Sequence, residues 1–345
     1  MTLAERIDVF TNLGKYLRQV VSEEDQQPGK TSISTLLRKA GLANPWFDKK
    51  SVLASLYHLS FLLEKDALHS WIKKYTPLNF KRQKKVAVVM AGNIPLVGFH
   101  DFLCGVLSGH KLLVKMSADD NVLLPFIAKI LEKENADISA YYEFCADRLS
   151  GFDAVIATGS DNTSRYFDYY FGRHPHIIRK NRNSTAVLSG SETQQELAGL
   201  ADDICMYYGK GCRSVSHVFV PQNYDFQPLI EKLSAYEDLL EMKKFRNNYI
   251  YQKTLAVING EHILDAGFLI LKECDEWASP IATLHFSFYN NTSSVVKSLQ
   301  ASKDKIQCVV TNEDIAHGIG FGTSQKPGLS DYADGIDTMA FLKNL

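Results

Sequence analysis

The sequence predicts an α/β protein with two parallel-sheet domains and an N-terminal helical cover. From residue 85 onward, short apolar strands alternate with amphipathic helices, which is typical of parallel sheets covered on both faces. The first 80 residues instead repeat apolar side chains at helical spacing, as at Leu3, Ile7, Phe10 and Leu13. A chain of 345 residues has room for about two domains.

The strands and helices after residue 80 are expected at regular intervals. The expected strands are 85–91, 111–115, 153–158, 185–188, 215–221, 254–258, 281–288 and 306–311. The expected helices are 51–68, 99–107, 122–133, one opening at 159–161, 197–208, 228–240 and 293–299. Gly109 and Gly209 follow helices, where a glycine commonly ends the last turn. The segment 318–337 is polar and rich in turns.

Composition and charge narrow the class of partner. The formal net charge is −1, which gives no electrostatic reason to expect nucleic acid or an anionic membrane. Six scattered cysteines without a CxxC pair suit a reducing compartment, and no residues have zinc-site spacing. The apolar run 86–99 is interrupted by Asn93 and Pro95 and is too short to span a bilayer. We therefore expect a cytoplasmic protein without a membrane span or a metal.

A cysteine follows the helix that Gly209 ends. Cys212 lies on a short glycine turn before a buried strand, with Lys210 and Arg213 close by in sequence. A thiol on such a turn, beside cations, is accessible to attack a substrate and is easily converted to the thiolate. The same pattern is also typical of a small cysteine packed in the core at a tight corner.

Three more candidates lie at the carboxyl ends of expected strands, where ligands bind in open α/β sheets. The amide of Asn93 is suited to donating a hydrogen bond to a substrate oxygen, or to satisfying its own turn. Gly159 and Ser160 lie between strand and helix, where backbone amides face a phosphate or simply cap the helix. Lys115 is placed to reach a ribose or phosphate, or to remain solvated.

The remaining candidates are less specific. The basic segment 173–182 is suited to contacting a nucleotide phosphate, although a charged crossover loop explains it nearly as well. Glu276 precedes a strand and is either a ribose-binding acid or a surface acid. His217 and His285 lie within strand patterns and are expected to be structural.

Taken in order, these segments resemble the aldehyde dehydrogenase superfamily, and within it the acyl-CoA and fatty-acyl reductases of the LuxC type. Residues 92–96 (GNIPL) are similar to the family's oxyanion segment, and 113–117 (LVKMS) to its ribose-binding segment. Residues 158–160 correspond to the phosphate turn, 209–212 (GKGC) to the nucleophile loop and 276–280 (EWASP) to a Glu-x-Phe-Gly-Pro motif.

The departures from the family pattern are informative. Hydrolytic members have a water-activating glutamate about 34 residues before the nucleophile, and that position here is Ile178. Without this base, the acyl group should pass to or from a thiol carrier rather than to water. Ala118 stands where NAD-preferring members often have a ribose-binding acid, which favours NADPH over NADH. The segment between Cys212 and Glu276 is compact, which puts the usual oligomerisation hairpin in doubt.

The resemblance implies NADPH-dependent reduction of an acyl thioester, such as acyl-CoA, to an aldehyde. Cys212 would be the nucleophile and Asn93 an oxyanion donor. The residues implied in cofactor binding are Lys115, Ser117, Gly159, Ser160 and Glu276. The alternatives are a reductase of an acyl-carrier-protein thioester or an acyl phosphate, or a catalytically silent nucleotide-binding or interaction protein.

The same resemblance divides the chain into four segments. Residues 1–80 are the helical segment and 81–204 the cofactor domain. Residues 205–318 form the catalytic domain, and 319–345 are a tail that returns to the cofactor domain or to an interface. The expected partner is a small-molecule acyl-CoA, and a homo-oligomer is possible.

Overall fold

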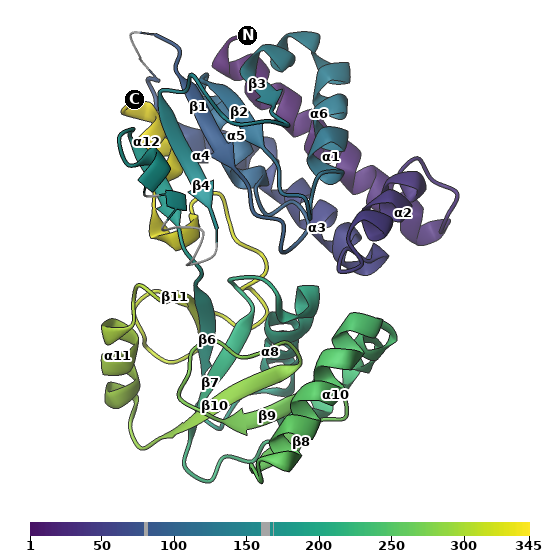
Figure 1. Ribbon diagram of the computed structural model, residues 1–345, viewed down its shortest axis with the longest axis vertical. Helices are drawn as coiled ribbons and strands as arrows, with labels where there is room; N and C mark the ends of the chain where they lie inside the picture. Colours follow the sequence, from purple (N-terminus) through teal and green to yellow (C-terminus); the bar gives the residue numbers. More distant parts are fainter. Residues whose placement is uncertain (79–81, 160–165, 168) are drawn as a thin grey trace. The chain divides into compact units, whose positions relative to one another are not determined.

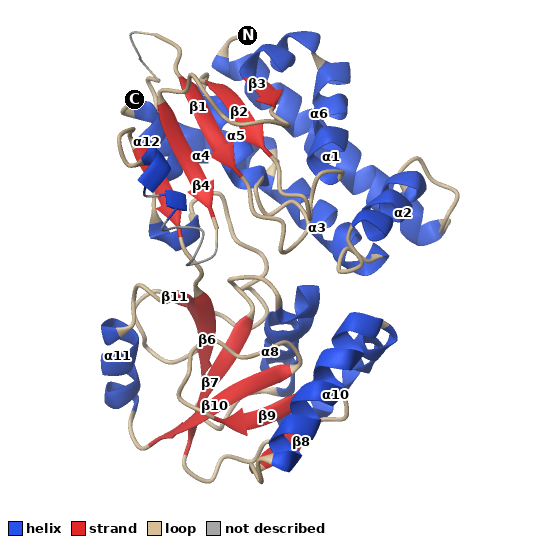
Figure 2. Cartoon of the chain, viewed as in Figure 1, coloured by secondary structure: helices blue, strands red, loops and turns tan. Residues whose placement is uncertain are grey.

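The computed structural model describes residues 1–78, 82–159, 166–167 and 169–345 of the chain (Figure 1). The described residues form two compact units. Unit 1 contains Met1–Lys180 and Gly328–Leu345, and unit 2 contains Asn181–Pro327. Each unit is an α/β structure with its own sheet (Figure 2). The α/β fold class expected from the alternating pattern is confirmed.

Unit 1 begins with four helices, α1 (Leu3–Gln26), α2 (Ser34–Ala43), α3 (Lys49–Leu62) and α4 (Lys65–Lys73). Thr2 and Glu5 cap the start of α1 reciprocally, each side chain accepting the other residue's amide. The predicted stripe of α1 is buried at Ile7, Phe10 and Leu13. The single helix predicted over 51–68 is wrong, because the chain leaves the helix at Leu63 and Glu64 and α4 begins at Lys65.

The sheet of unit 1 has five parallel strands in the order β3-β2-β1-β4-β5. Their bounds are β1 (Lys85–Val89), β2 (Lys111–Lys115), β3 (Tyr142–Phe144), β4 (Ala154–Thr158) and β5 (His176–Arg179). Helix α5 (Phe99–Ser108) connects β1 to β2, and helix α6 (Leu123–Glu134) lies between β2 and β3 in the sequence. The chain then crosses to the other side of β1 to form β4. Parallel sheets bind ligands at such a reversal of strand order.

The sheet of unit 2 has seven strands in the order β12-β11-β6-β7-β10-β9-β8. Its strands are β6 (Asn183–Val187), β7 (Val215–Pro221), β8 (Ile263–Asp265), β9 (Ile270–Glu273), β10 (Thr283–Tyr289), β11 (Ile306–Val310) and β12 (Gly318–Ile319). Only β8 runs antiparallel to its neighbour among the described strands. The helices are α8 (Gln194–Cys205), α9 (Gln227–Leu233), α10 (Lys243–Ile258) and α11 (Thr292–Ala301).

The strand predicted at 254–258 is wrong, since these residues form the last turns of α10. Its buried residues Phe245, Tyr249 and Ala256 recur at helical spacing, while the rest of the helix is largely exposed. A five-residue apolar run cannot distinguish a strand from a helix by itself. The predictions also miss β5 in the basic segment and β9, whose sequence has few β-branched residues.

The C-terminal residues 328–345 pack in unit 1, where α12 (Thr338–Lys343) lies beside α5 (Figure 1). The two units are divided after residues 180 and 327, whereas the predicted segments end at 204 and 318. The roles assigned to those segments stay predictions. No helix among the described residues has the length and hydropathy to cross a membrane.

Candidate active site

The nucleophile loop follows α8 in unit 2. A capping box of Thr193 and Glu196 starts this helix, and its last helical residue is Cys205. Tyr207 and Tyr208 then adopt left-handed φ values of 54° and 59°, and Gly209 follows with 69°. The helix predicted to run through Tyr208 therefore ends earlier. Consecutive left-handed tyrosines cost conformational energy, which the surrounding packing must offset.

Cys212 lies on a tight turn that closes on itself. The amide of Gly211 donates to the Ser214 hydroxyl at 3.2 Å, and the Ser214 amide donates to the Gly211 carbonyl at 3.0 Å. The hydroxyl of Ser184, on the neighbouring strand β6, donates to the carbonyl of Cys212 at 2.9 Å. Cys212 is half-buried, whereas Cys205 in the preceding helix is buried. The turn thus presents a cysteine without enclosing it in the core.

Arg213, one of the two cations beside Cys212, makes a structural contact within unit 2. The guanidinium of Arg213 donates through Nε to the carbonyl of Ser324 at 2.7 Å, so it holds the backbone of a distant segment. Lys210 is half-buried and follows the left-handed turn. Arg213 is therefore first of all a structural contact of the loop.

Glu276 lies in the segment before β10, in the same unit as Cys212, and it is exposed. Its carbonyl is 3.0 Å from Nδ1 of His285, a buried residue of β10. The next carbonyl, of Trp277, accepts a hydrogen bond from the hydroxyl of Ser216 at 2.7 Å. Ser216 lies four residues after Cys212, so one short contact connects the segment of Glu276 to the strand that follows the nucleophile loop.

The histidines predicted to be structural are buried in strands. Nε2 of His217 in β7 is 2.9 Å from the Ser287 hydroxyl, which donates to Asp275 at 2.7 Å. Burial lowers the pKa of His217 to about 4, so this imidazole is neutral at pH 7. The described residues contain no cluster of three or more His, Cys, Asp or Glu suited to a metal ion.

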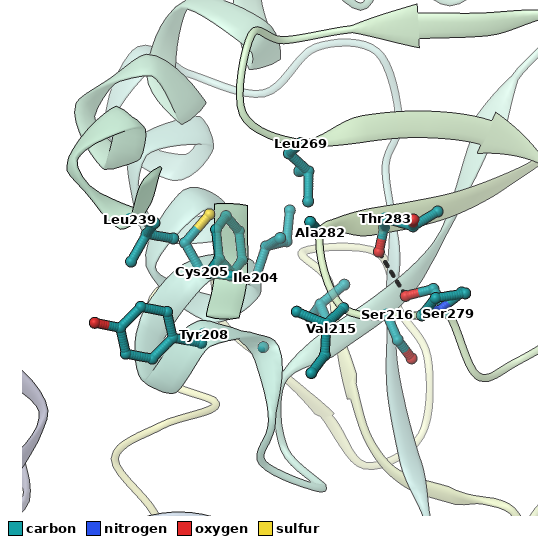
Figure 3. A pocket seen from close by; sticks show the side chains of 14 residues that line it. Ile204, Cys205, Tyr208, Val215, Ser216, Leu239, Leu269, Ser279, Ala282 and Thr283 are labelled. Carbon is teal, nitrogen blue, oxygen red and sulfur yellow. Dashed lines mark hydrogen bonds between the residues drawn. The ribbon is translucent and has the colours of Figure 1, made fainter. Parts of the chain in front are cut away.

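A pocket lies beside the start of the nucleophile loop (Figure 3). Its walls include the side chains of Ile204, Tyr208, Leu239 and Leu269, and Cys205 lines the same space. The hydroxyl of Thr283, which also lines the pocket, is buried and has no hydrogen-bond partner among the described residues. Its lining residues belong to unit 2, and it adjoins Gly209 rather than the turn that holds Cys212.

Asn93 follows β1 in unit 1, on a loop that packs tightly against the loop after β2. A side chain on Gly92 would meet Ser117 at 2.7 Å and the Asp120 amide at 3.0 Å, so only glycine fits there. The amide of Leu96 donates to the Asp120 carboxylate at 2.8 Å, and Leu96 itself has a left-handed φ of 58°. These contacts fix the loop that carries the half-buried Asn93.

The predicted cofactor residues of unit 1 gather at the carboxyl edge of its sheet. Ser117 follows β2 and Gly159 follows β4, on either side of β1 and Asn93. The ammonium of Lys115 donates to the carbonyl of Ala146 and, at 3.2 Å, to that of Asp147. It therefore binds the loop after β3 in this structure. Ser160 lies outside the described residues.

The basic segment does not form a phosphate site at Arg179. This arginine ends β5 and is buried, and its guanidinium pairs with Asp101 of α5 and donates to the Thr338 hydroxyl at 2.8 Å. Burial opposes its charge, but the carboxylate of Asp101 holds the pKa of Arg179 above its ordinary value. The reading of Arg179 as a nucleotide contact is corrected to an internal ion pair.

The structure thus brings the predicted residues together in two groups. Asn93, Lys115, Ser117 and Gly159 share one edge of the unit 1 sheet, and the segments of Cys212 and Glu276 are connected in unit 2. Two aspartates were missed. Asp120 and Asp203 each accept a backbone amide from a remote loop, and in the sequence each is the second acid of an Asp-Asp pair.

Comparison with known proteins identifies the family of this chain. A family model described as acyl-CoA reductase (LuxC) matches residues 24–243, more than half of the 345 residues. The long-chain acyl-protein thioester reductase of Vibrio harveyi is 27% identical over 178 residues, 45% of this chain and 36% of that protein. The protein of the same name from Aliivibrio fischeri is 24% identical over 228 residues, 59% of this chain and 46% of that protein. The match thus spans less than half of either relative.

Solved structures with the same fold are aldehyde dehydrogenases. Aldehyde dehydrogenase 21 from Physcomitrella patens matches with a TM-score of 0.68 and 11% identity, over 100% of this chain and 84% of that one. A putative aldehyde dehydrogenase from Burkholderia cenocepacia matches with a TM-score of 0.64 and 13% identity, over 90% and 74%. The chain has the aldehyde dehydrogenase fold and belongs to the LuxC acyl-CoA reductase family.

Proposed function

We propose that this chain reduces an acyl thioester to an aldehyde through a covalent thioester on Cys212. The observation that carries the proposal is the half-buried Cys212 on a hydrogen-bonded turn, in a chain of the LuxC family. The relatives from Vibrio harveyi and Aliivibrio fischeri are named long-chain acyl-protein thioester reductases, which agrees with this reaction class.

In the first step, the thiolate of Cys212 attacks the carbonyl carbon of the thioester. The developing oxyanion is stabilised by the side-chain amide of Asn93 and the backbone amide of Cys212. The bond to the carrier sulfur then breaks, and the carrier thiol leaves with the proton that Cys212 lost. The acyl group is now held as a thioester of Cys212.

A reduced nicotinamide cofactor, when bound, supplies the hydride that converts this acyl group to the aldehyde. The Cys212 sulfur leaves as the carbonyl is restored. The carboxyl edge of the unit 1 sheet fits such a cofactor, because the order of strands reverses between β1 and β4. Ser117, Gly159 and Lys115 would hold it there, Lys115 after releasing the carbonyls of Ala146 and Asp147. The family resemblance adds Ser160 and Glu276 to the cofactor-binding residues.

Exchange with a thiol rather than hydrolysis is supported by the residue at position 178. Ile178 lies in β5 and pairs with Ala157. By its position 34 residues before Cys212 it corresponds to the water-activating glutamate of hydrolytic members, and its side chain carries no carboxylate. Without a general base, water attacks the acyl-enzyme slowly, and the acyl group persists long enough to be reduced. The donor we propose is acyl-CoA. The names of the relatives, long-chain acyl-protein thioester reductases, favour a protein-bound thioester as the second candidate.

NADPH is the proposed cofactor, because Ala118 places no carboxylate against a 2′-phosphate. The neighbouring Asp119 is exposed on the same loop, whereas the carboxylate of Asp120 accepts the Leu96 amide. If Asp119 instead binds a ribose hydroxyl, NADH will bind more tightly than NADPH, and Asp119→Ala will reverse that order. Titration of both cofactors into the two proteins separates these cases.

The proposal is tested by mass spectrometry after incubation with acyl-CoA esters of several chain lengths. We expect one acyl group on Cys212 in the wild type, its loss on adding NADPH, and no acylation of Cys212→Ala. Cys274→Ala is the matched control, because Cys274 is also half-buried in unit 2. Acylation of Cys274 instead, or full NADPH oxidation by Cys212→Ala, would exclude the mechanism.

The same panel compares acyl-carrier-protein thioesters and acyl phosphates with acyl-CoA. A protein that is acylated by none of these donors and binds neither cofactor is catalytically silent, and the proposal then fails.

A further inference from the structure

A segment more than 100 residues after the nucleophile loop forms hydrogen bonds to that loop. We call residues 321–325 the brace, and they lie in unit 2 with α8 and Cys212. A side chain on Gly199 of α8 would meet the Gly322 amide at 2.8 Å, and Gly322 has a left-handed φ of 77°. The helix and the brace therefore touch backbone to backbone, where only glycine fits on either side.

Asp203 of α8 binds the brace through both carboxylate oxygens. One oxygen accepts the amide of Gly322 at 2.7 Å, and the other accepts the amide of Ser324 at 2.9 Å. The residue is fully buried. Burial raises the pKa of Asp203, while the two amides favour its charged form. A carboxylate suits this arrangement, because its two oxygens accept the two backbone amides that the brace directs toward it.

The other end of the brace holds the turn that carries Cys212. The side-chain amide of Gln325 donates to the Ser214 hydroxyl at 3.2 Å, and that hydroxyl accepts the Gly211 amide. The carbonyl of Ser324 accepts the guanidinium of Arg213 at 2.7 Å. The residues on both sides of Cys212 are thus tied to the brace, and the brace is tied to Asp203.

We propose that Asp203, acting through the brace, is a positioning residue that sets the orientation of the Cys212 thiol. This inference rests on the proposed function, in which that thiol attacks a carbonyl. Displacement of a reacting group by about 1 Å is enough to cost roughly 100-fold in rate. The effect of Asp203 passes through Ser324, Gln325 and the turn at Ser214.

The test uses Asp203→Asn and Gln325→Met. The asparagine turns one acceptor into a donor that faces a backbone amide, and the methionine removes the donor to Ser214 at similar volume. Asp202→Asn is the matched control, because Asp202 is the adjacent acid of α8 and accepts from Tyr236 at 2.7 Å, away from the brace.

We expect Asp203→Asn and Gln325→Met to lower the rate of Cys212 acylation at saturating acyl-CoA at least 10-fold, with the Kd for NADPH unchanged. The rate of Cys212 alkylation by iodoacetamide should change by a similar factor, with Cys274 as internal reference. Asp202→Asn should match the wild type in both assays. Equal acylation and alkylation rates in all folded variants would overturn the inference, as would a rise in KM with kcat unchanged.

If Asp203→Asn does not fold, Gln325→Met decides the outcome alone. The alkylation readout keeps this test separate from the proposed function. A wild type that is never acylated overturns the proposed function, while altered alkylation in Gln325→Met still supports the brace. Normal acylation in the wild type with unaltered variants overturns the brace alone.

Discussion

Each unit holds its candidate catalytic loop with one aspartate, but the two aspartates differ in kind. In unit 1, Asp120 accepts the amide of Leu96 through one carboxylate oxygen and is half-buried. In unit 2, Asp203 accepts two amides and is fully buried. Burial raises the pKa of Asp120 to about 6 and also raises that of Asp203. Burial outweighs the backbone amides that Asp120 accepts, so the charge of Asp120 depends on pH near neutrality.

The difference between Asp120 and Asp203 indicates how firmly the loop of Asn93 and the turn of Cys212 are each held. The loop of Asn93 is held by side chains and by one titrating group. The turn of Cys212 is held by a backbone seam at Gly199 and Gly322 and by a network that contains several amides. We infer that the turn of Cys212 is the more rigid of the two loops and that the loop of Asn93 is the more sensitive to pH.

The largest expected effect is on the rate of catalysis, and it comes from a substitution in the unit 1 loop. Asn93→Ala should lower kcat about 100- to 1,000-fold, because it removes a donor to the oxyanion at the transition state. KM should change little, since the ground-state carbonyl gains less from that donor. Stopped-flow measurement of acylation with acyl-CoA checks this. A large rise in KM at unchanged kcat would assign Asn93 to substrate binding instead.

A second prediction concerns the charge of Asp120. Its pKa in the folded protein, about 6, lies above the ordinary 3.8, so the folded state holds a proton that the unfolded chain releases between those values. The contribution of this group to stability therefore falls as pH rises through that window, by up to about 3 kcal/mol. Asp120→Asn lacks this loss while keeping an acceptor for Leu96.

Urea unfolding at about pH 4 and about pH 7 measures the effect. Relative to the wild type, Asp120→Asn should gain stability between the lower and the higher pH. The exposed Asp119→Asn serves as control and should follow the wild type. If the difference between Asp120→Asn and the wild type is the same at both pH values, Asp120 is already charged throughout.

The smallest expected effect is on stability, and it comes from a substitution in unit 2 where α8 meets the brace. Gly322→Ala should destabilise the protein by about 1–2 kcal/mol, because a methyl group is disfavoured at a left-handed φ and would lie 3.0 Å from the Cα of Gly199. Gly320→Ala is the matched control, since no atom lies within 4 Å of its added Cβ. Thermal unfolding compares the two. Equal melting temperatures of the two variants would mean that the backbone around Gly322 accommodates the methyl group without loss of stability.

Much of the fold is predictable because its signals are local. The strands at Lys111–Lys115 and Val215–Pro221 match their apolar runs, and the end of α5 at Gly109 follows from its left-handed conformation. The parallel sheet then explains why Asn93 and Ser117 share one edge. These conclusions need only periodicity, turn chemistry and the rule that strand ends bind ligands.

The rest depends on contacts between residues far apart in sequence. Asp203 and Gly322 are separated by 119 positions, and nothing local marks either as a partner of the other. Tyr208 fits the helical stripe by spacing, yet it adopts a left-handed conformation that tertiary packing imposes. Arg179 appeared to be a surface cation because its partner Asp101 lies in another predicted helix.

The return of the chain to unit 1 has a consequence for the order of synthesis. Tyr332 accepts the indole N–H of Trp71 at 2.9 Å, and its hydroxyl is 2.7 Å from that of Tyr75, so residues after unit 2 complete the packing of α4. A ribosome adds about 5–20 residues per second. Unit 1 is therefore completed only after unit 2 has been made, and its helix α4 must wait on the order of 10 s for Tyr332.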